Sequence, residues 1–81
     1  HVEFKQKSMT AFDLKKIASA GGNLIINEGN YSGLDLKMVA TASREGKGTL
    51  MIKRVRRLSG LDCQNIASEN PGHVTFDFSE E

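Results

Sequence analysis

The sequence predicts an α/β domain with the element order β-(αβ)₃, in which a four-stranded parallel sheet with strand order 1-2-3-4 carries three helices on one face. Three observations lead to this prediction. A helix-start pattern occurs three times, each copy is followed by a glycine-containing break, and each break leads into a short run of aliphatic or aromatic residues. Because 81 residues suffice for one domain only, residues 1–81 are all assigned to it.

The first predicted strand lies within residues 1–9. Val2 and Phe4 alternate with Glu3 and Lys5, and this period of two is typical of a strand with one buried face. We expect the two apolar side chains to point toward the helices and the two charged side chains to point away from them.

Three helix–strand units follow, over residues 10–31, 32–58 and 59–81. Each begins with a hydroxyl residue that can cap the free amides of a first helical turn, and an aspartate follows three positions later, as in a capping box. The aspartate also favours the positive end of the helix dipole. Apolar residues before the cap and four positions into the helix have the spacing of a hydrophobic staple. The capping pairs are Thr10 with Asp13, Ser32 with Asp35, and Ser59 with Asp62; the staple pairs are Met9 with Leu14, Tyr31 with Leu36, and Leu58 with Cys63.

The helical period of 3.6 residues predicts which side of each helix is buried. We expect a stripe that recurs in all three helices and contains one alanine per helix, which would allow close approach to the sheet. Cys63 is interpreted as a small buried hydrophobic residue and not as a reactive thiol. The expected stripe comprises Phe12, Ile17, Ala18, Leu34, Val39, Ala40, Leu61, Ile66 and Ala67.

Apolar runs after the three breaks predict the remaining strands. Strand–helix–strand connections of this length give parallel pairing with right-handed crossovers, so consecutive strands should lie side by side. With every helix on one face, the other face stays uncovered, which is unusual for a parallel sheet. The residues expected to face the helices are Leu24, Ile26, Leu50, Ile52, Val74, Phe76 and Phe78. The residues expected on the uncovered face are Ile25, Asn27, Met51, Lys53, Thr75 and Asp77, together with Glu3 and Lys5.

The spacing of apolar residues resembles the L-x-L-x-x-N-x-L-x-x-L core of leucine-rich repeats. The resemblance extends over nearly the whole chain, although Lys7 and Gly29 replace the asparagine of that core. The exposed strand face of leucine-rich repeats typically binds protein, and the resemblance implies the same role here. It is carried by Val2-x-Phe4-x-x-Lys7-x-Met9-x-x-Phe12, by Leu24-x-Ile26-x-x-Gly29-x-Tyr31-x-x-Leu34 and, with one extra residue, by Leu50-x-Ile52 leading to Leu58-x-x-Leu61.

The composition of the uncovered face predicts a protein-interaction module. Ile25 and Met51 are expected to be neighbours at its centre, with charged residues around them. An apolar centre inside a polar border is the usual composition of a protein-contact patch. We therefore expect this face to bind another protein or a second copy of the same chain.

A basic cluster gives an alternative function, that of a nucleic-acid-associated accessory protein. Its side chains could hold phosphate groups electrostatically. The formal net charge of +1 and the absence of aromatic residues within the cluster argue against this alternative. Three acids near the C-terminus, Asp77, Glu80 and Glu81, could also neutralise it. The cluster comprises Lys53, Arg54, Arg56 and Arg57.

No catalytic or metal-binding set is recognisable. His1, His73 and Cys63 do not have the spacing of a nucleophile–base pair or a zinc site, so we expect no catalytic residue, no metal and no cofactor. The apolar runs are too short to span a bilayer, and a lone cysteine is not typical of a secreted disulfide scaffold. We expect a cytoplasmic, non-enzymatic protein without a membrane partner. The chain could also be a module of a longer repeat array, with an artificial edge strand.

Overall fold

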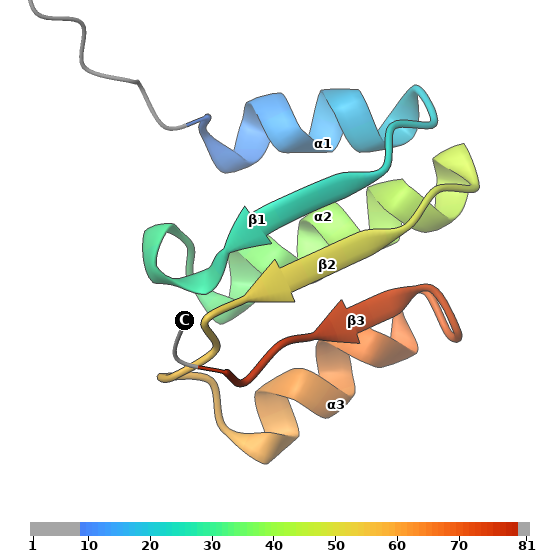
Figure 1. Ribbon diagram of the computed structural model, residues 1–81. Helices are drawn as coiled ribbons and strands as arrows, with labels where there is room; N and C mark the ends of the chain where they lie inside the picture. Colours follow the sequence, from blue (N-terminus) through green and yellow to red (C-terminus); the bar gives the residue numbers. More distant parts are fainter. Residues whose placement is uncertain (1–8, 80–81) are drawn as a thin grey trace, which may run out of the picture.

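The computed structural model describes residues 9–79 and has a mixed α/β fold (Figure 1). Within this part of the chain, three helices alternate with the three strands of one parallel sheet. The strand expected at Val2–Lys5 lies outside the described residues. The elements are α1 (Ala11–Ser19), β1 (Leu24–Asn27), the short 3₁₀ helix η1 (Glu28–Asn30), α2 (Gly33–Gly46), β2 (Leu50–Lys53), α3 (Gly60–Ser68) and β3 (Val74–Phe76).

The strand order is β1-β2-β3 and both pairings are parallel, as the sequence predicts for these strands. The register aligns Leu24 with Leu50 and Leu50 with Val74, so side chains of equal direction form rows across the sheet. In Figure 1, α2 lies behind β1 and β2, and it packs against α1 on one side and α3 on the other. The three strands all end at the same edge of the sheet, which we call the carboxyl edge.

The predicted capping boxes are present at all three helix starts. The Asp35 amide donates to Ser32 Oγ at 3.0 Å, and the Ser32 amide donates to Asp35 Oδ2 at 3.2 Å. Equivalent pairs of bonds join Thr10 with Asp13 and Ser59 with Asp62. Each box satisfies two amides that the helix cannot pair internally. The three aspartates therefore have the structural role that the sequence predicts.

The predicted buried stripe is correct in part. Ala18, Val39, Ala40 and Ile66 are buried, and Ala67 is half-buried. Ile17 is 38% exposed, because α1 has a helix neighbour on one side only among the described elements.

Phe12, Leu34 and Leu61 were expected in the buried stripe, and the structure shows that this prediction is wrong. They are 62%, 69% and 65% exposed. Each is the second residue of its helix, whereas the core-facing position is the fourth, occupied by the buried Leu14 in α1 and Leu36 in α2. Residues two positions apart in a helix are separated by about 200° around its axis. The second position therefore points away from the sheet when the fourth points toward it.

Exposure alternates along the strands as expected for a sheet covered on one face. Leu50 and Ile52 are buried beneath the helices, whereas Ile25 is 67% exposed on the opposite face. Phe78 was expected to face the helices but is 63% exposed. It lies beyond the end of β3, where no described helix covers it, and its ring stacks on that of Phe76 at 6.3 Å between centroids.

Candidate functional site

The residues expected on the uncovered face lie together where the structure describes them. The parallel register places Ile25, Met51 and Thr75 in one row across the three strands, and it places Asn27 beside Lys53. Ile25, Asn27 and Thr75 are exposed, whereas Met51 and Lys53 on the central strand are half-buried by their neighbours. Glu3 and Lys5, which were expected on the same face, lie outside the described residues. We call Ile25, Asn27, Met51, Lys53, Thr75 and Asp77 the sheet-face patch.

Asp77 extends this patch beyond the end of β3. Its amide donates to Ile52 O at 2.8 Å, and its carbonyl accepts from the Val55 amide at 3.1 Å, so it runs alongside the end of β2. The Asp77 carboxylate accepts a bond from the Ser79 amide at 2.9 Å. Hydrogen bonding by Ser79 is the main reason that the pKa of Asp77 is below its ordinary value, and the positive charge of Lys53 lowers it further. The Asp77 side chain is thus favoured as an ionised carboxylate, and it lies near Lys53, a residue of the basic cluster.

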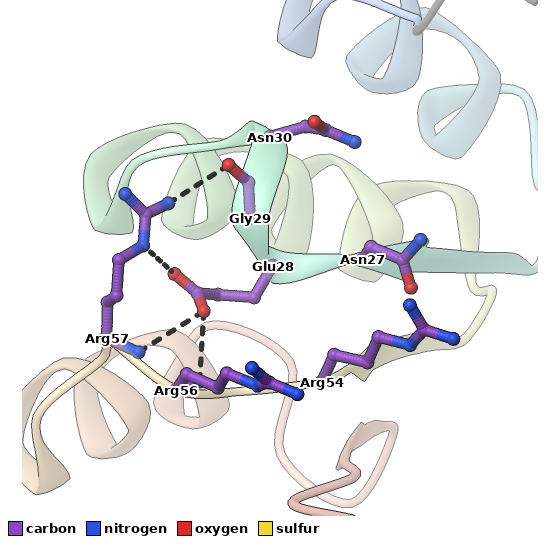
Figure 2. Close-up of a pocket in the computed structure, with 7 residues that line it drawn as sticks. All are labelled: Asn27, Glu28, Gly29, Asn30, Arg54, Arg56 and Arg57. Carbon is purple, nitrogen blue, oxygen red and sulfur yellow. Dashed lines mark hydrogen bonds and ion pairs between the residues drawn. The ribbon is translucent and has the colours of Figure 1, made fainter. Parts of the chain in front are cut away.

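A second acid, Glu28, joins the loops that follow β1 and β2 (Figure 2). Its side chain is 2% exposed. The Arg56 and Arg57 amides donate to Glu28 Oε1 at 3.0 and 3.3 Å, and the Arg57 guanidinium donates through Nε to Glu28 Oε2 at 3.1 Å. The same guanidinium also donates to the carbonyl of Gly29 at 3.0 Å. These four bonds fix the shape of residues 54–57, which we call the arginine loop.

The charge of Glu28 is stabilised by its partners. Burial would by itself raise the pKa of the carboxyl group, but the amide bonds from Arg56 and Arg57 and the Arg57 guanidinium together hold that pKa below its ordinary value of 4.5. A carboxylate with this many donors stays ionised at neutral pH. Glu28 therefore neutralises Arg57, which is one of the four residues of the predicted basic cluster.

Arg54 and Arg56 lie in the same segment as Arg57 but differ from it in their surroundings. Both are exposed, and within residues 9–79 neither guanidinium takes part in an ion pair. Together with the Glu28–Arg57 pair they line a pocket of about 350 Å³ at the carboxyl edge. Arg54 has a φ of 55°, a left-handed conformation that is uncommon for residues other than glycine. The lining residues are Asn27, Glu28, Gly29, Asn30, Arg54, Arg56 and Arg57 (Figure 2).

The position of this arginine pocket follows from the topology. Loops that leave neighbouring parallel strands emerge side by side at the carboxyl edge, where ligands bind in many open α/β sheets. Residues 28–30 follow β1 and residues 54–57 follow β2, so the two loops are neighbours. The sequence pattern indicates the arginines, whereas the place of Glu28 and Gly29 in the site is seen only in the structure. Their place directly after an apolar run, one unit before the arginines, is the signal that could have identified them.

Cys63 and His73 are not among the residues that line the pocket. Cys63 is half-buried in α3, and burial raises the pKa of its thiol, with the charges of Asp62 and Glu28 adding to the effect. His73 is exposed in the turn before β3. Among the described residues, no three His, Cys, Asp or Glu side chains are close enough to hold a metal ion. None of the helices in residues 9–79 has the length and apolar character needed to cross a bilayer.

The surface at the carboxyl edge thus combines the sheet-face patch with a preformed arginine pocket. Asn27 and Lys53 belong to the patch, and the next residues along each chain segment, Glu28 and Arg54, line the pocket. The two features are therefore contiguous in the fold. Comparison with known proteins found no family model, no curated protein and no solved structure that matches the chain.

Proposed function

We propose that the chain is a non-enzymatic protein-binding module that binds an acidic segment of another protein through the sheet-face patch. The observation that carries the proposal is the 67% exposure of Ile25, on a parallel sheet face that no described element covers. Parallel sheets are almost always covered on both faces. An uncovered face that carries an exposed apolar residue is suited to docking a partner.

The composition of the patch supports this use. Ile25 and the half-buried Met51 lie side by side, and the polar residues Asn27, Lys53 and Thr75 lie around them. Protein interfaces have this arrangement of an apolar centre and a polar rim. The resemblance to leucine-rich repeats implies the same face, because in that family the exposed strand face typically binds protein.

The charges near the patch favour an acidic partner. Lys53 lies on the patch itself, and the guanidinium groups of Arg54 and Arg56 lie at its carboxyl edge without an acidic partner in the described part of the chain. Asp77 is the acid of the patch. Complementary charge steers association and selects partners, so a carboxylate-rich segment beside an apolar anchor fits this surface.

Photo-crosslinking from two positions tests the proposal. A photoreactive amino acid replaces Ile25 on the sheet face or, as a matched control, Leu34, which is 69% exposed but lies on the helix side. In cells that contain the protein, position 25 should crosslink to a partner with an acidic segment, and position 34 should not. A Met51→Lys substitution should abolish the crosslink. Crosslinking from both positions alike, or from neither, would contradict the proposal, as would a crosslink between two copies of this chain.

Binding of nucleic acid through Lys53, Arg54, Arg56 and Arg57 is a second candidate function. It is favoured by the exposure of Arg54 and Arg56, whose charges are available to phosphates. Fluorescence anisotropy with single-stranded and duplex oligonucleotides should then show binding that weakens as salt increases. The Arg54→Gln/Arg56→Gln double variant should lose it, whereas Arg44→Gln in the last turn of α2 should not. Binding unaffected by the double variant would reject this candidate.

A further inference from the structure

We infer that the arginine pocket is a binding site for a phosphate monoester carried by a small molecule. The pocket shares only Asn27 with the sheet-face patch, because its other lining residues follow β1 and β2, and Ile25, Met51 and Thr75 do not line it. Three properties of the pocket carry the inference: its net charge, its accessible backbone and donors, and its size.

The charge of the pocket matches a phosphate dianion. Of its four ionisable lining residues, Glu28 and Arg57 neutralise each other across a 3.1 Å ion pair. Arg54 and Arg56 remain, and their two positive charges are paired with no acid among residues 9–79. A phosphate monoester has a charge of about −1.5 to −2 near neutral pH. Two guanidinium groups can therefore neutralise it, and arginine is well suited to phosphate because it donates in a planar, bidentate geometry.

The pocket also offers uncharged donors and an open backbone. Asn27 and Asn30 are among its lining residues and carry side-chain amides that can donate, and Figure 2 shows the Arg54 side chain extending toward Asn27. Gly29 lies between them in the same loop, and a β-carbon at this position would meet no atom within 4 Å. A ligand can therefore approach the backbone of this loop closely.

The pocket is held in shape before any ligand binds. The Glu28 side chain is buried, and it fixes the backbone of Arg56 and Arg57 by two amide hydrogen bonds. Arg54 is kept in a left-handed conformation that costs energy in most residues and is common at binding sites.

The pocket has a volume of about 350 Å³, which is at the lower end of small-molecule pockets. This volume suits a phosphate group with a small organic substituent and not an extended polymer.

Nuclear magnetic resonance of the whole chain tests the inference with defined probes. Inorganic phosphate, O-phosphoserine and adenosine monophosphate should each shift the guanidinium Nε–H signals of Arg54 and Arg56 in a saturable manner. Acetate and chloride at the same ionic strength should not. The affinity should fall about tenfold in Arg54→Gln or Arg56→Gln and be lost in the double variant. The Arg56→Gln substitution keeps the backbone amide that binds Glu28, so the loop retains its fold. Arg44→Gln serves as the matched control.

The outcomes separate this site from the proposed functions. Saturable phosphate binding that is lost in the double variant supports the pocket, whether or not position 25 crosslinks to a partner. Equal shifts with acetate and phosphate would overturn it and indicate a carboxylate site. Shifts only with oligonucleotides, and not with monophosphates, would also overturn it and favour nucleic-acid binding. The dispersion of the amide signals shows in the same spectra that each variant is folded.

Discussion

Glu28 shows how a single side chain connects two loops that are distant in the sequence. It accepts bonds from Arg56 and Arg57, 28 and 29 residues further along the chain. A buried carboxylate would be costly if it were isolated, but here three hydrogen bonds, one of which is also an ion pair, compensate it. The same contacts hold the arginine loop in place, so the stability of the carboxyl edge and the geometry of the pocket depend on one residue.

Replacing Glu28 with glutamine should therefore reduce stability in a pH-dependent way. At pH 7 the loss should be about 1–3 kcal/mol, because the amide cannot satisfy the same donors as the carboxylate. The pKa of Glu28 in the folded chain is below its ordinary value of 4.5, so its stabilisation is fully present above that pH and is lost as the pH falls through the folded pKa. Urea denaturation at pH 7, 5 and 3.5 measures the gap between the native chain and Glu28→Gln.

That gap should narrow at pH 3.5. Glu45→Gln, which replaces an exposed acid near the end of α2, is the matched control and should change stability by less than about 0.5 kcal/mol at pH 7. A gap that stays constant or widens on acidification would show that the charge of Glu28 does not contribute to folding.

For whole helices and strands, local signals in the sequence were sufficient. Ser32 and Asp35, for example, lie three residues apart and form their capping box within one helical turn, so the pattern predicts the start of α2 without tertiary information. The strands were predictable because β1, β2 and β3 follow equivalent helices and pair in chain order. The direction of the side chains was predicted less well at the helix starts. Leu34 and Leu36 are both leucine, yet Leu34 is exposed and Leu36 is buried.

Leu34 and Leu36 provide a direct test of the corrected helix orientation. Leu36 is fully buried and Leu34 is 69% exposed, two positions apart in the same helix. Leu36→Ala should cost about 2–5 kcal/mol, because it leaves a cavity in the core. Leu34→Ala should change stability by less than about 0.5 kcal/mol, since the side chain has little contact to lose. Chemical denaturation of the two variants measures both values. Similar losses in the two variants would mean that the second helical position is not directed away from the sheet.

The entire domain depends on contacts that no local pattern reports. Asn70, at the end of the α3 segment, is buried and donates both to Ser43 Oγ and to the Gly48 carbonyl at 3.2 Å, which ties the end of α2 to the following unit. At the carboxyl edge, the Glu28–Arg57 pair joins the segment that follows β1 to the segment that follows β2. Sequence spacing does not indicate such partners, because they meet only after parallel pairing has brought successive units together. The arginines of the candidate site are visible in the sequence as a charged run, whereas the only sign of Glu28 there is its place directly after the preceding strand, and its pairing with Arg57 is seen only in the fold.

Gly46 provides a third contact of this kind, because it lets the end of α2 approach the end of α1 closely. This contact leads to a prediction about the stability of the whole domain. Replacing a helical glycine with alanine ordinarily stabilises the helix by up to about 1 kcal/mol. Here a β-carbon on Gly46 would collide with the Ala18 carbonyl oxygen of α1 and lie 2.8 Å from the Gly21 amide. The substitution must therefore separate α1 from α2, and in a domain this small little buried surface is available to compensate.

Gly46→Ala should accordingly destabilise the domain although it raises intrinsic helix propensity. We expect a loss of about 1–3 kcal/mol, which in a domain of this size lowers the melting temperature by roughly 4–8 °C per kcal/mol. Gly60→Ala is the matched control, because it is also a helical glycine and a β-carbon there would meet no atom within 4 Å. Its melting temperature should be unchanged or slightly higher. Thermal unfolding followed by circular dichroism measures both variants, and a Gly46→Ala variant as stable as Gly60→Ala would show that α1 and α2 do not pack as closely as this fold requires.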